Sequence, residues 1–161
     1  MSDLPHFDAD GHAKMVDVGP KAETHRIAKA RATVQMQSDT ARLIQDRKIQ
    51  KGDVLELARI AGIMASKKTA ELIPLCHPLR LDSVEVRFEF VTESELEIES
   101  TVSAHDRTGV EMEALQTVST AALAVYDMCK SVDRAMTITN LQLVEKSGGK
   151  SGHFLRSNHE A

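Results

Sequence analysis

The chain has 161 residues, enough for one domain with a substantial buried core. Aromatic residues make up only 3% and tryptophan is absent, which argues against a nucleic-acid surface built on base stacking. The net charge of −4 argues against a broad polyanion-binding surface, and no run of roughly 18 apolar residues could span a bilayer. Neither nucleic acid nor a membrane is therefore expected as a partner.

The termini and the cysteines indicate the domain organisation and the cellular compartment. The first residues are polar and acidic and have no apolar core of a signal peptide. Cys76 and Cys129 form neither a CxxC motif nor a metal-ligand spacing, so a reduced, cytoplasmic protein is the simplest interpretation. We expect residues 1–20 to form an extended arm, residues 21–152 a single domain and residues 153–161 a flexible tail.

The first half of the chain predicts one strand and two helices. Residues 26–36 alternate between apolar and polar in their second half, which indicates a strand. Ser38 and Asp39 are typical N-cap residues and predict a short helix. Asp53 can cap a second helix over residues 53–73, and Gly62 inside it indicates close packing. The buried stripe expected for this helix consists of Leu57, Ile60, Ala61 and Met64.

The second half predicts a β-hairpin, a long helix and a last strand. Residues 81–90 and 95–102 alternate cleanly on either side of a short turn. A Thr108-Gly109 turn then precedes a stretch to residue 130 without Gly or Pro, with apolar residues at three- and four-residue steps: Leu115, Val118, Ala122, Val125 and Cys129. Residues 136–144 alternate again, and the glycine-rich stretch after them is loop-like.

This order of elements predicts the fold class. Apart from the extra short helix, it is the βαββαβ pattern of ferredoxin-like domains. The expected fold is therefore α+β: a two-layer sandwich in which helices cover one face of an antiparallel sheet. The other sheet face would carry glutamates and no aromatic platform, which disfavours RNA binding there.

Two pairs of charged residues lie at the ends of the long helix. Glu111 and Glu113 are in its first turn, and Asp127 and Lys130 lie three residues apart in its last turn, on one face. On spacing alone, an Asp–Lys pair three residues apart is more often a solvated surface ion pair than a catalytic pair. Lys51 stands at the break between the two earlier helices.

Two loops have residues suited to ligand binding. Pro74 and Pro78 hold His77 in an extended segment, where it could bind phosphate, move a proton, ligate a metal or have no function. Cys76 could be a nucleophile or a small buried residue. The stretch KSGGKSG (146–152) lacks the spacing of an ATPase loop, but its lysines and free N–H groups suit an anionic ligand. The alternative is a disordered basic tail.

Several stretches together resemble one family. They are MVDVGPKAETHRIAKA (15–30), KGDVLELARIAGI (51–63), ELIPLCHPL (71–79), TGVEMEAL (108–115), AVYDMCK (124–130) and KSGGKSG (146–152). They are similar to the motifs of the MoaC family, the cyclic pyranopterin monophosphate synthases of molybdenum cofactor biosynthesis. The resemblance covers residues 15–152, nearly the whole chain.

The resemblance implies an activity, an assembly and a set of site residues. The substrate would be a 3′,8-cyclised 7,8-dihydro-GTP, and the products cyclic pyranopterin monophosphate and pyrophosphate. The assembly would be a homo-hexamer, a trimer of dimers. The catalytic residues implied are Asp127, Lys130 and Lys51. The substrate-binding residues implied are Leu75, Cys76, His77, Met112, Glu113, Glu111, Arg26, Lys21, Lys146 and Lys150.

This chemistry accounts for the residue types. A triphosphate requires several cations, and the ring rearrangement requires positioned acids and bases. Asp127 beside Lys130 is such a pair, and a lysine among other cations would have a lowered pKa. No acidic set is spaced for a metal, so we expect no cofactor, although Mg²⁺ could accompany the triphosphate. Glu113 and Asp127 lie 14 residues apart, about 21 Å along a helix, which predicts a site shared between subunits. The competing hypothesis is an oligomeric nucleotide sensor that returns its ligand unchanged.

Overall fold

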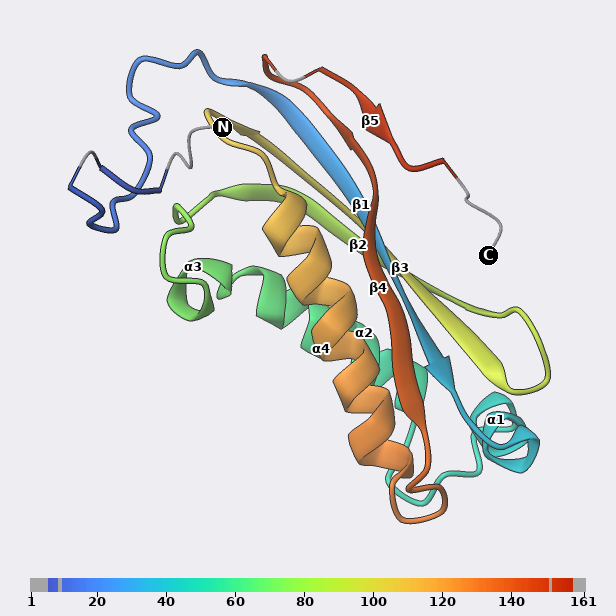
Figure 1. The fold of residues 1–161 in the computed structure, drawn as a ribbon. Coiled ribbons are helices and arrows are strands. Elements are labelled where there is room, and N and C mark those ends of the chain that lie inside the picture. The colour runs from blue at the N-terminus through green and yellow to red at the C-terminus, as the bar shows by residue number, and fades with distance from the viewer. Residues whose placement is uncertain (1–5, 9, 151, 158–161) are drawn as a thin grey trace.

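The fold is known from a computed structural model that describes residues 6–8, 10–150 and 152–157. Its elements follow in the order β1 (Thr24–Gln35), α1 (Ser38–Gln45), α2 (Val54–Ser66), α3 (Thr69–Leu72), β2 (Leu81–Phe90), β3 (Glu95–Asp106), α4 (Glu111–Cys129), β4 (Thr137–Ser147) and β5 (Phe154–Leu155). The strands form one sheet, and α2 and α4 pack against it (Figure 1). Among the described helices, none has the length and apolarity that crossing a bilayer requires.

The sheet has the strand order β2-β3-β1-β4-β5, and every neighbouring pair is antiparallel. The order β2-β3-β1-β4, with helices in the two crossovers, is the predicted ferredoxin-like arrangement. The two-residue strand β5 pairs with β4 in the stretch predicted to be loop-like. It is too short to show an alternating pattern in the sequence. Residues 158–161 of the expected tail lie outside the described residues.

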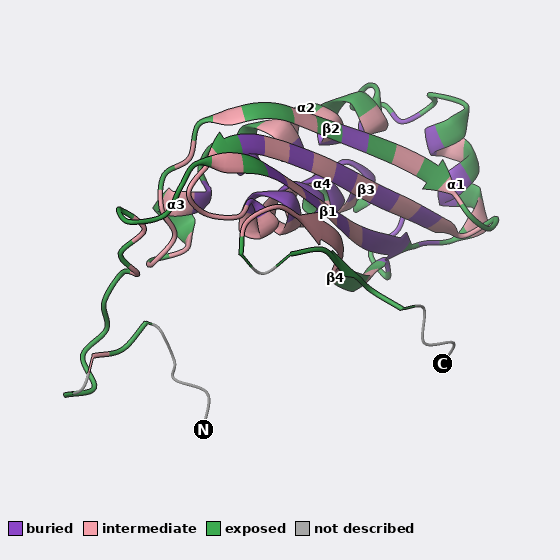
Figure 2. Ribbon diagram, turned by 90° about the horizontal axis from the view of Figure 1, so that it is seen from above, coloured by how far each residue is buried: buried purple, intermediate pink, exposed green. Residues whose placement is uncertain are grey.

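The strands β1, β2 and β3 alternate between the core and the open face (Figure 2). The alternation predicted for residues 136–144 is not seen in β4, where Asn140 has a positive φ of 53° and the register with β1 shifts. Along β3 the residues that point to the helices are completely buried: Leu96, Ile98, Ser100, Val102 and Ala104. Two strands continue beyond their predicted ends, β3 to Asp106 and β4 to Ser147. The longer β4 places Lys146 on a strand next to β1 rather than in a free loop.

The long helix α4 packs on the sheet through the predicted stripe. Val118, Ala122, Val125 and Cys129 have no exposed surface, and Leu115 is half-buried against the core. The small residues between them let the helix approach the strands closely. The backbone of α4 is also tied to β3, since the hydroxyl of Ser100 donates to the carbonyl oxygen of Ala114 over 2.8 Å. A helix held along its length in this way fixes the positions of both its ends.

The helix α2 packs on α4 through a face other than the one predicted. Its buried residues are Val54, Ala58, Gly62, Ala65 and Ser66, whereas most of the predicted stripe is about half exposed. A Cβ added at Gly62 would lie 2.8 Å from the carbonyl oxygen of Thr117, so the two helices approach through small residues. The predicted stripe was wrong because α2 is apolar on two faces, and side-chain size decides which face fits against α4. The predicted single helix is also broken at residues 67–68, before α3.

The short helix α1 has a cap that its own sequence did not reveal. Its N-cap residue is Gln37, which makes no side-chain hydrogen bond. Instead the carboxylate of Asp133, which is 2% exposed, accepts from the Gln37 backbone N–H over 2.8 Å and from the Thr40 hydroxyl over 3.3 Å. The cap predicted for α2 is confirmed, because Asp53 accepts from the backbone N–H of Glu56 over 3.1 Å.

The residues before β1 form an extended arm that projects from the sheet (Figure 2). Its hydrogen bonds include one from the Lys21 N–H to the Val18 carbonyl and one from the Lys14 N–H to the His6 carbonyl. Residues 1–5 and 9 of the expected arm lie outside the described residues. The arm ends at Lys21, where the chain reaches the candidate site.

Candidate functional site

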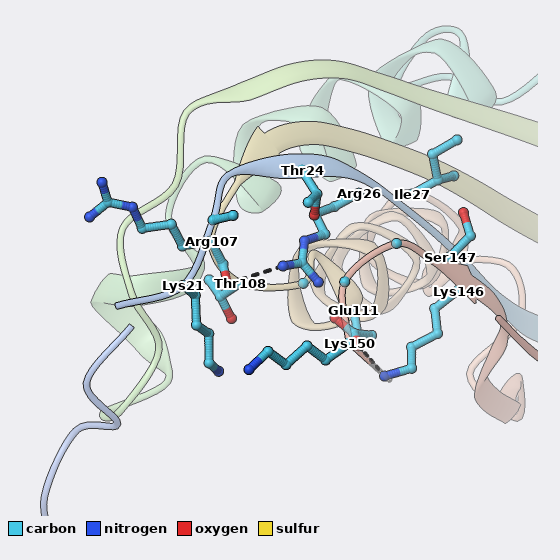
Figure 3. Close-up of a pocket in the computed structure, with 14 residues that line it drawn as sticks. Lys21, Thr24, Arg26, Ile27, Arg107, Thr108, Glu111, Lys146, Ser147 and Lys150 are labelled. Carbon is cyan, nitrogen blue, oxygen red and sulfur yellow. Dashed lines mark hydrogen bonds and ion pairs between the residues drawn. The ribbon is translucent and has the colours of Figure 1, made fainter. Parts of the chain in front are cut away.

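A basic pocket lies where the starts of β1 and α4 meet the end of β4, and it has a volume of 540 Å³. Four basic side chains reach the same space from separate segments (Figure 3), namely Lys21, Arg26, Lys146 and Lys150. Arg107 also lines the pocket wall, but its side chain points away from these four, and its Nη2 atom lies 3.6 Å from Oε1 of Glu23. Five residues implied as substrate-binding, namely Lys21, Arg26, Glu111, Lys146 and Lys150, therefore line one cavity. The pairing of β1 with β4 is what joins the two ends of the chain here.

Arg26 is the fixed centre of this pocket. It is 9% exposed, and it donates from Nε to the carbonyl oxygen of Asp106 (3.3 Å) and from Nη2 to that of Arg107 (3.2 Å). Gly149 lies directly over its guanidinium with φ +72°, and a Cβ at this position would overlap the Arg26 side chain. Glycine is thus required both by the backbone conformation and by the contact. The arrangement places a guanidinium and a glycine-rich backbone turn side by side, which suits an anion.

Lys146 and Glu111 form an ion pair across the pocket. The Nζ atom of Lys146 lies 3.0 Å from Oε1 of Glu111, and the two side chains are only 27% and 28% exposed. The pair joins β4 to the first turn of α4. An anionic ligand that reached Lys146 would compete with the Glu111 carboxylate for the same ammonium group.

Two polar atoms in the pocket wall are buried without a hydrogen-bond partner among the described residues. They are the hydroxyl of Thr24 and the Nε of Arg107. Buried polar groups are normally paired, so the Thr24 hydroxyl could bond a ligand in the pocket, whereas the Arg107 side chain is turned toward Glu23. The sequence did not single out Thr24, Arg107 or Thr108 as pocket residues. The available signal was a basic residue directly before the Thr108-Gly109 turn.

A second cavity of 410 Å³, the loop pocket, adjoins the basic pocket and shares Lys21 and Glu111 with it. It is lined by the remaining residues implied as substrate-binding, namely Leu75, Cys76, His77, Met112 and Glu113. His77 follows a turn in which the Cys76 N–H donates to the Ile73 carbonyl oxygen over 3.1 Å, so the segment from Pro74 to Pro78 is not extended throughout as predicted. The loop runs past the first turn of α4, so the LCH and ME motifs face one cavity.

Glu113 is the buried acid of the loop pocket, with 4% of its surface exposed. Burial raises the pKa of its carboxyl to about 7, while a hydrogen bond from its own backbone N–H acts in the opposite direction. The negative charge of Glu111 adds a further upward contribution to that pKa. A carboxyl group that titrates near neutrality can both give and take a proton, so Glu113 is equipped for acid–base chemistry as well as for binding.

Cys76 is not an activated thiol. Burial raises the pKa of its thiol, and the charge of Glu113 adds to the increase. The thiolate is the nucleophilic form, and a raised pKa keeps the group protonated at neutral pH. Of the two alternatives for Cys76, the small, partly buried residue fits the structure better than the nucleophile.

The three residues implied as catalytic lie together at the other end of α4. The Lys130 ammonium is 2.7 Å from Oδ1 of Asp127, and the Lys51 ammonium donates to the Asp127 carbonyl oxygen over 2.8 Å. The ammonium of Lys51 is also 3.9 Å from Oδ2 of Asp127. We call these residues the Asp127 cluster; their side chains are between 43% and 62% exposed.

The lowered pKa expected for Lys130 was wrong. The hydrogen bond from Lys130 lowers the pKa of Asp127, with smaller contributions from the charges of Lys130 and Lys51. The same hydrogen bond raises the pKa of Lys130. The expectation failed because the group nearest to Lys130 is a carboxylate rather than another cation. In a single chain Lys130 is therefore a protonated donor.

The loop pocket and the Asp127 cluster lie at opposite ends of the helix layer. Glu113 and Asp127 are 14 residues apart on α4, which corresponds to about 21 Å along its axis. Within one chain, the structure brings the predicted binding residues together and the predicted catalytic residues together, but it does not join the two groups.

Comparisons with known proteins agree with the motifs. The family model described as MoaC family matches residues 15–149. The chain belongs to the MoaC family. Three relatives are each named cyclic pyranopterin monophosphate synthase: those of Desulfitobacterium hafniense (53% identical; 98% of this chain and 96% of the relative), Thermomicrobium roseum (55%; 100% and 98%) and Novosphingobium aromaticivorans (58%; 94% and 96%).

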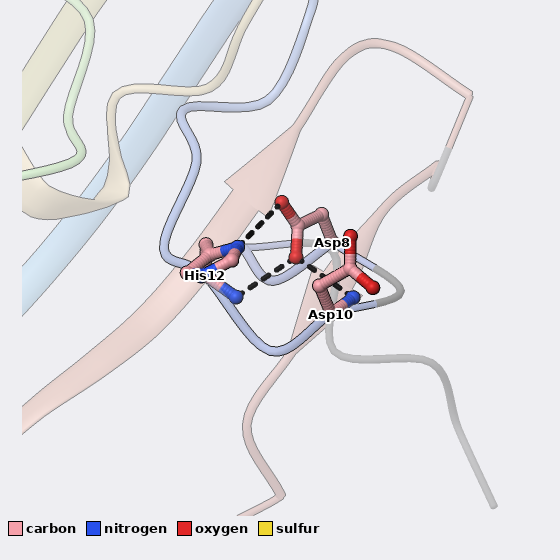
Figure 4. A group of neighbouring side chains, drawn as sticks. All are labelled: Asp8, Asp10 and His12. Carbon is pink, nitrogen blue, oxygen red and sulfur yellow. Dashed lines mark hydrogen bonds and ion pairs between the residues drawn. The ribbon is translucent and has the colours of Figure 1, made fainter.

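The match to the MoaC family includes the Asp127 cluster and the residues that line both pockets, except for Lys150 in the basic pocket and His6 in the loop pocket. It leaves out the arm before residue 15, where Asp8, Asp10 and His12 place their ligand atoms within 4.8 Å of one another (Figure 4). Oδ1 of Asp8 accepts from the backbone N–H groups of Asp10 (3.0 Å) and His12 (2.8 Å), which is the geometry of an Asx turn. The Asx turn by itself accounts for the close approach of these three side chains.

Proposed function

We propose that this MoaC-family protein is a pyrophosphate-releasing lyase. It converts a 3′,8-cyclised 7,8-dihydro-GTP into cyclic pyranopterin monophosphate, an early step of molybdenum cofactor biosynthesis. One observation carries the proposal: a basic pocket suited to a triphosphate adjoins a loop pocket with a buried carboxyl that titrates near neutrality. The names of the relatives support the same reaction.

The basic pocket holds the phosphate end of the substrate. Arg26 is pre-organised by two backbone carbonyls, so it loses little conformational freedom on binding a phosphate. Lys21, Lys146 and Lys150 approach from the arm, β4 and the glycine turn. When the substrate's hydroxyl attacks the α-phosphorus, the bond to the β-phosphate breaks and pyrophosphate leaves. The same cations stabilise the charge that develops on this leaving group.

The loop pocket holds the ring end of the substrate. Opening the guanine-derived ring and building the pterin and pyran rings requires proton transfers, which a positioned acid or base accelerates. Glu113 and His77 face the pocket from two different segments, and the Asp127 cluster supplies a protonated lysine and a carboxylate. We infer that no resident metal takes part and that Mg²⁺ enters only with the triphosphate.

We infer that the complete site combines two subunits. One substrate molecule does not span the roughly 21 Å between Glu113 and Asp127 with its reacting rings. A two-fold axis would place the Asp127 cluster of one chain beside the loop pocket of another. The proposed assembly is a homo-hexamer, a trimer of such dimers.

The function is tested by turnover. Purified protein is incubated with the cyclised nucleotide made by a radical enzyme, and pyrophosphate and the pterin product are measured. The expected result is stoichiometric release of both products by the wild type and little release by Lys130→Ala, with GTP unconverted as a substrate control. A protein that binds the cyclised nucleotide and returns it unchanged is a sensor, and the proposal then fails.

A further inference from the structure

Glu111 stands between the two pockets of the candidate site and lines both of them. Its carboxylate is folded back over the turn before α4, because a Cβ at Gly109 would overlap its Oε2 atom. In this position Oε1 of Glu111 lies 3.0 Å from the Lys146 ammonium in the basic pocket. Gly109 therefore leaves room for a carboxylate in the wall that the two pockets share.

The charge of Glu111 also acts on Glu113, the buried acid of the loop pocket. Both residues lie in the first turn of α4, and Glu113 is 4% exposed, so little water separates it from neighbouring charges. The negative charge of Glu111 raises the pKa of the Glu113 carboxyl, and the Lys146 ammonium beside Glu111 opposes that effect. The other titratable groups that line the loop pocket are His6 and Lys21 from the arm and Cys76 and His77 from the loop.

We propose that Glu111 couples the two pockets electrostatically: an anion that draws Lys146 away from Glu111 leaves an uncompensated negative charge, and Glu113 takes up a proton from solvent in response. The competition for Lys146 follows from the geometry, since its side chain and that of Glu111 are only 27% and 28% exposed. A like charge close to a carboxyl favours the protonated form. The inference rests on the proposed function in one respect, that the anion is the phosphate end of the substrate.

The coupling makes Glu113 an acid when substrate is present. Binding of the phosphate end moves one proton from solvent to a carboxylate oxygen of Glu113, and no other bond forms or breaks in this step. The protonated carboxyl then faces the ring end of the substrate in the loop pocket, where it can donate. After pyrophosphate leaves, Lys146 returns to Glu111, and the protonation equilibrium of Glu113 returns to that of the empty site.

Proton uptake is measured by isothermal titration calorimetry of pyrophosphate binding, in buffers of different ionisation enthalpy between pH 6 and 9. Pyrophosphate carries the charge of the leaving group and does not react. It titrates near neutrality itself, so the quantity compared is the difference in uptake between wild type and Glu113→Gln, in which its own protons cancel. A tenfold shift in the protonation equilibrium of Glu113 gives a difference of about half a proton per site at the maximum.

Variants of the ion pair separate the coupling from a direct effect of the anion on Glu113. Glu111→Gln and Lys146→Gln each remove the pair, so each should lose at least about half of the uptake, measured against the same variant combined with Glu113→Gln. The matched control is Lys150→Gln, which removes a cation from the same pocket and leaves the pair in place. It should weaken binding and retain the uptake. Circular dichroism verifies folding, and Lys146→Gln gives the same comparison from β4 if Glu111→Gln does not fold.

The outcomes distinguish the coupling from the proposed function. Wild type that binds pyrophosphate without uptake by Glu113 overturns the coupling and leaves the proposed function standing. Uptake that is unchanged in Glu111→Gln or Lys146→Gln shows that the anion acts on Glu113 directly, and this result also overturns the coupling. Wild type that does not bind pyrophosphate overturns both the basic pocket as the phosphate site and the coupling that depends on it.

Discussion

A mixing experiment tests whether two subunits build one site. Glu113→Ala removes the buried acid of the loop pocket, and Asp127→Ala removes the carboxylate of the Asp127 cluster, about 21 Å away on the same helix. If each site takes Glu113 from one chain and Asp127 from the other, each homo-oligomer has only damaged sites. After the two variants are refolded together in equal amounts, half of the dimers are mixed. Each mixed dimer has one intact site and one doubly damaged site, so activity should recover to about a quarter of wild type.

The double variant provides a control in which a shared site lowers the activity of the mixture instead of restoring it. When Glu113→Ala/Asp127→Ala is refolded with wild type in equal amounts, a shared site predicts about a quarter of full activity, because mixed dimers have no intact site. A site within one chain predicts about half. Turnover is measured as pyrophosphate release, and subunit exchange is verified with differently tagged chains. A single-variant mixture that stays inactive despite confirmed exchange, together with half activity in the control, would refute the shared site.

Four further predictions concern single residues. Asp127→Asn should lower turnover by ~10²–10⁴-fold, as proton-transfer residues do, while stability changes little because Asp127 is exposed; unchanged turnover in a steady-state assay would contradict its role. Arg26→Ala should weaken binding of the cyclised nucleotide in calorimetry, and added salt should weaken wild-type binding; unaltered affinity in both cases would exclude the basic pocket as the phosphate site. Glu113→Gln should remove a pH dependence of stability. The pKa of the Glu113 carboxyl rises from 4.5 to about 7 on folding, so the protonated carboxyl stabilises the fold fully below pH 4.5. That contribution, at most about 3 kcal/mol, is lost as the pH rises through 7. Denaturant titrations from pH 4 to 8 should therefore show a decline in the wild type that the variant lacks. Gly62→Ala should lower the free energy of unfolding by about 1 kcal/mol or more, since its Cβ would lie 2.8 Å from the Thr117 carbonyl oxygen; a more stable variant would show that α2 can move away from α4.

The sequence by itself determined most of the elements and the position of the site motifs in them. Alternation in residues 81–90 and the stripe from Val118 to Cys129 follow from the two periods of side-chain direction, so they can be identified without tertiary information. The pairing of Asp127 with Lys130 is likewise local, because residues three apart on a helix are neighbours. The basic pocket, by contrast, joins residues from the two ends of the chain through the pairing of β1 with β4, which no local pattern indicates.

Only the tertiary structure decided the properties that depend on contacts between distant segments. Which face of α2 is buried depends on the room beside Thr117, so hydrophobicity indicated the wrong one. The cap of α1 comes from Asp133, far along the chain, and Arg107 forms part of the wall of the basic pocket only because β3 ends there. The pKa of Glu113 near 7 reflects its burial, and the raised pKa of Lys130 reflects its carboxylate neighbour. A sequence states which groups are present. How far each group is buried, how much room it has and how close it lies to other charges depend on the folded chain.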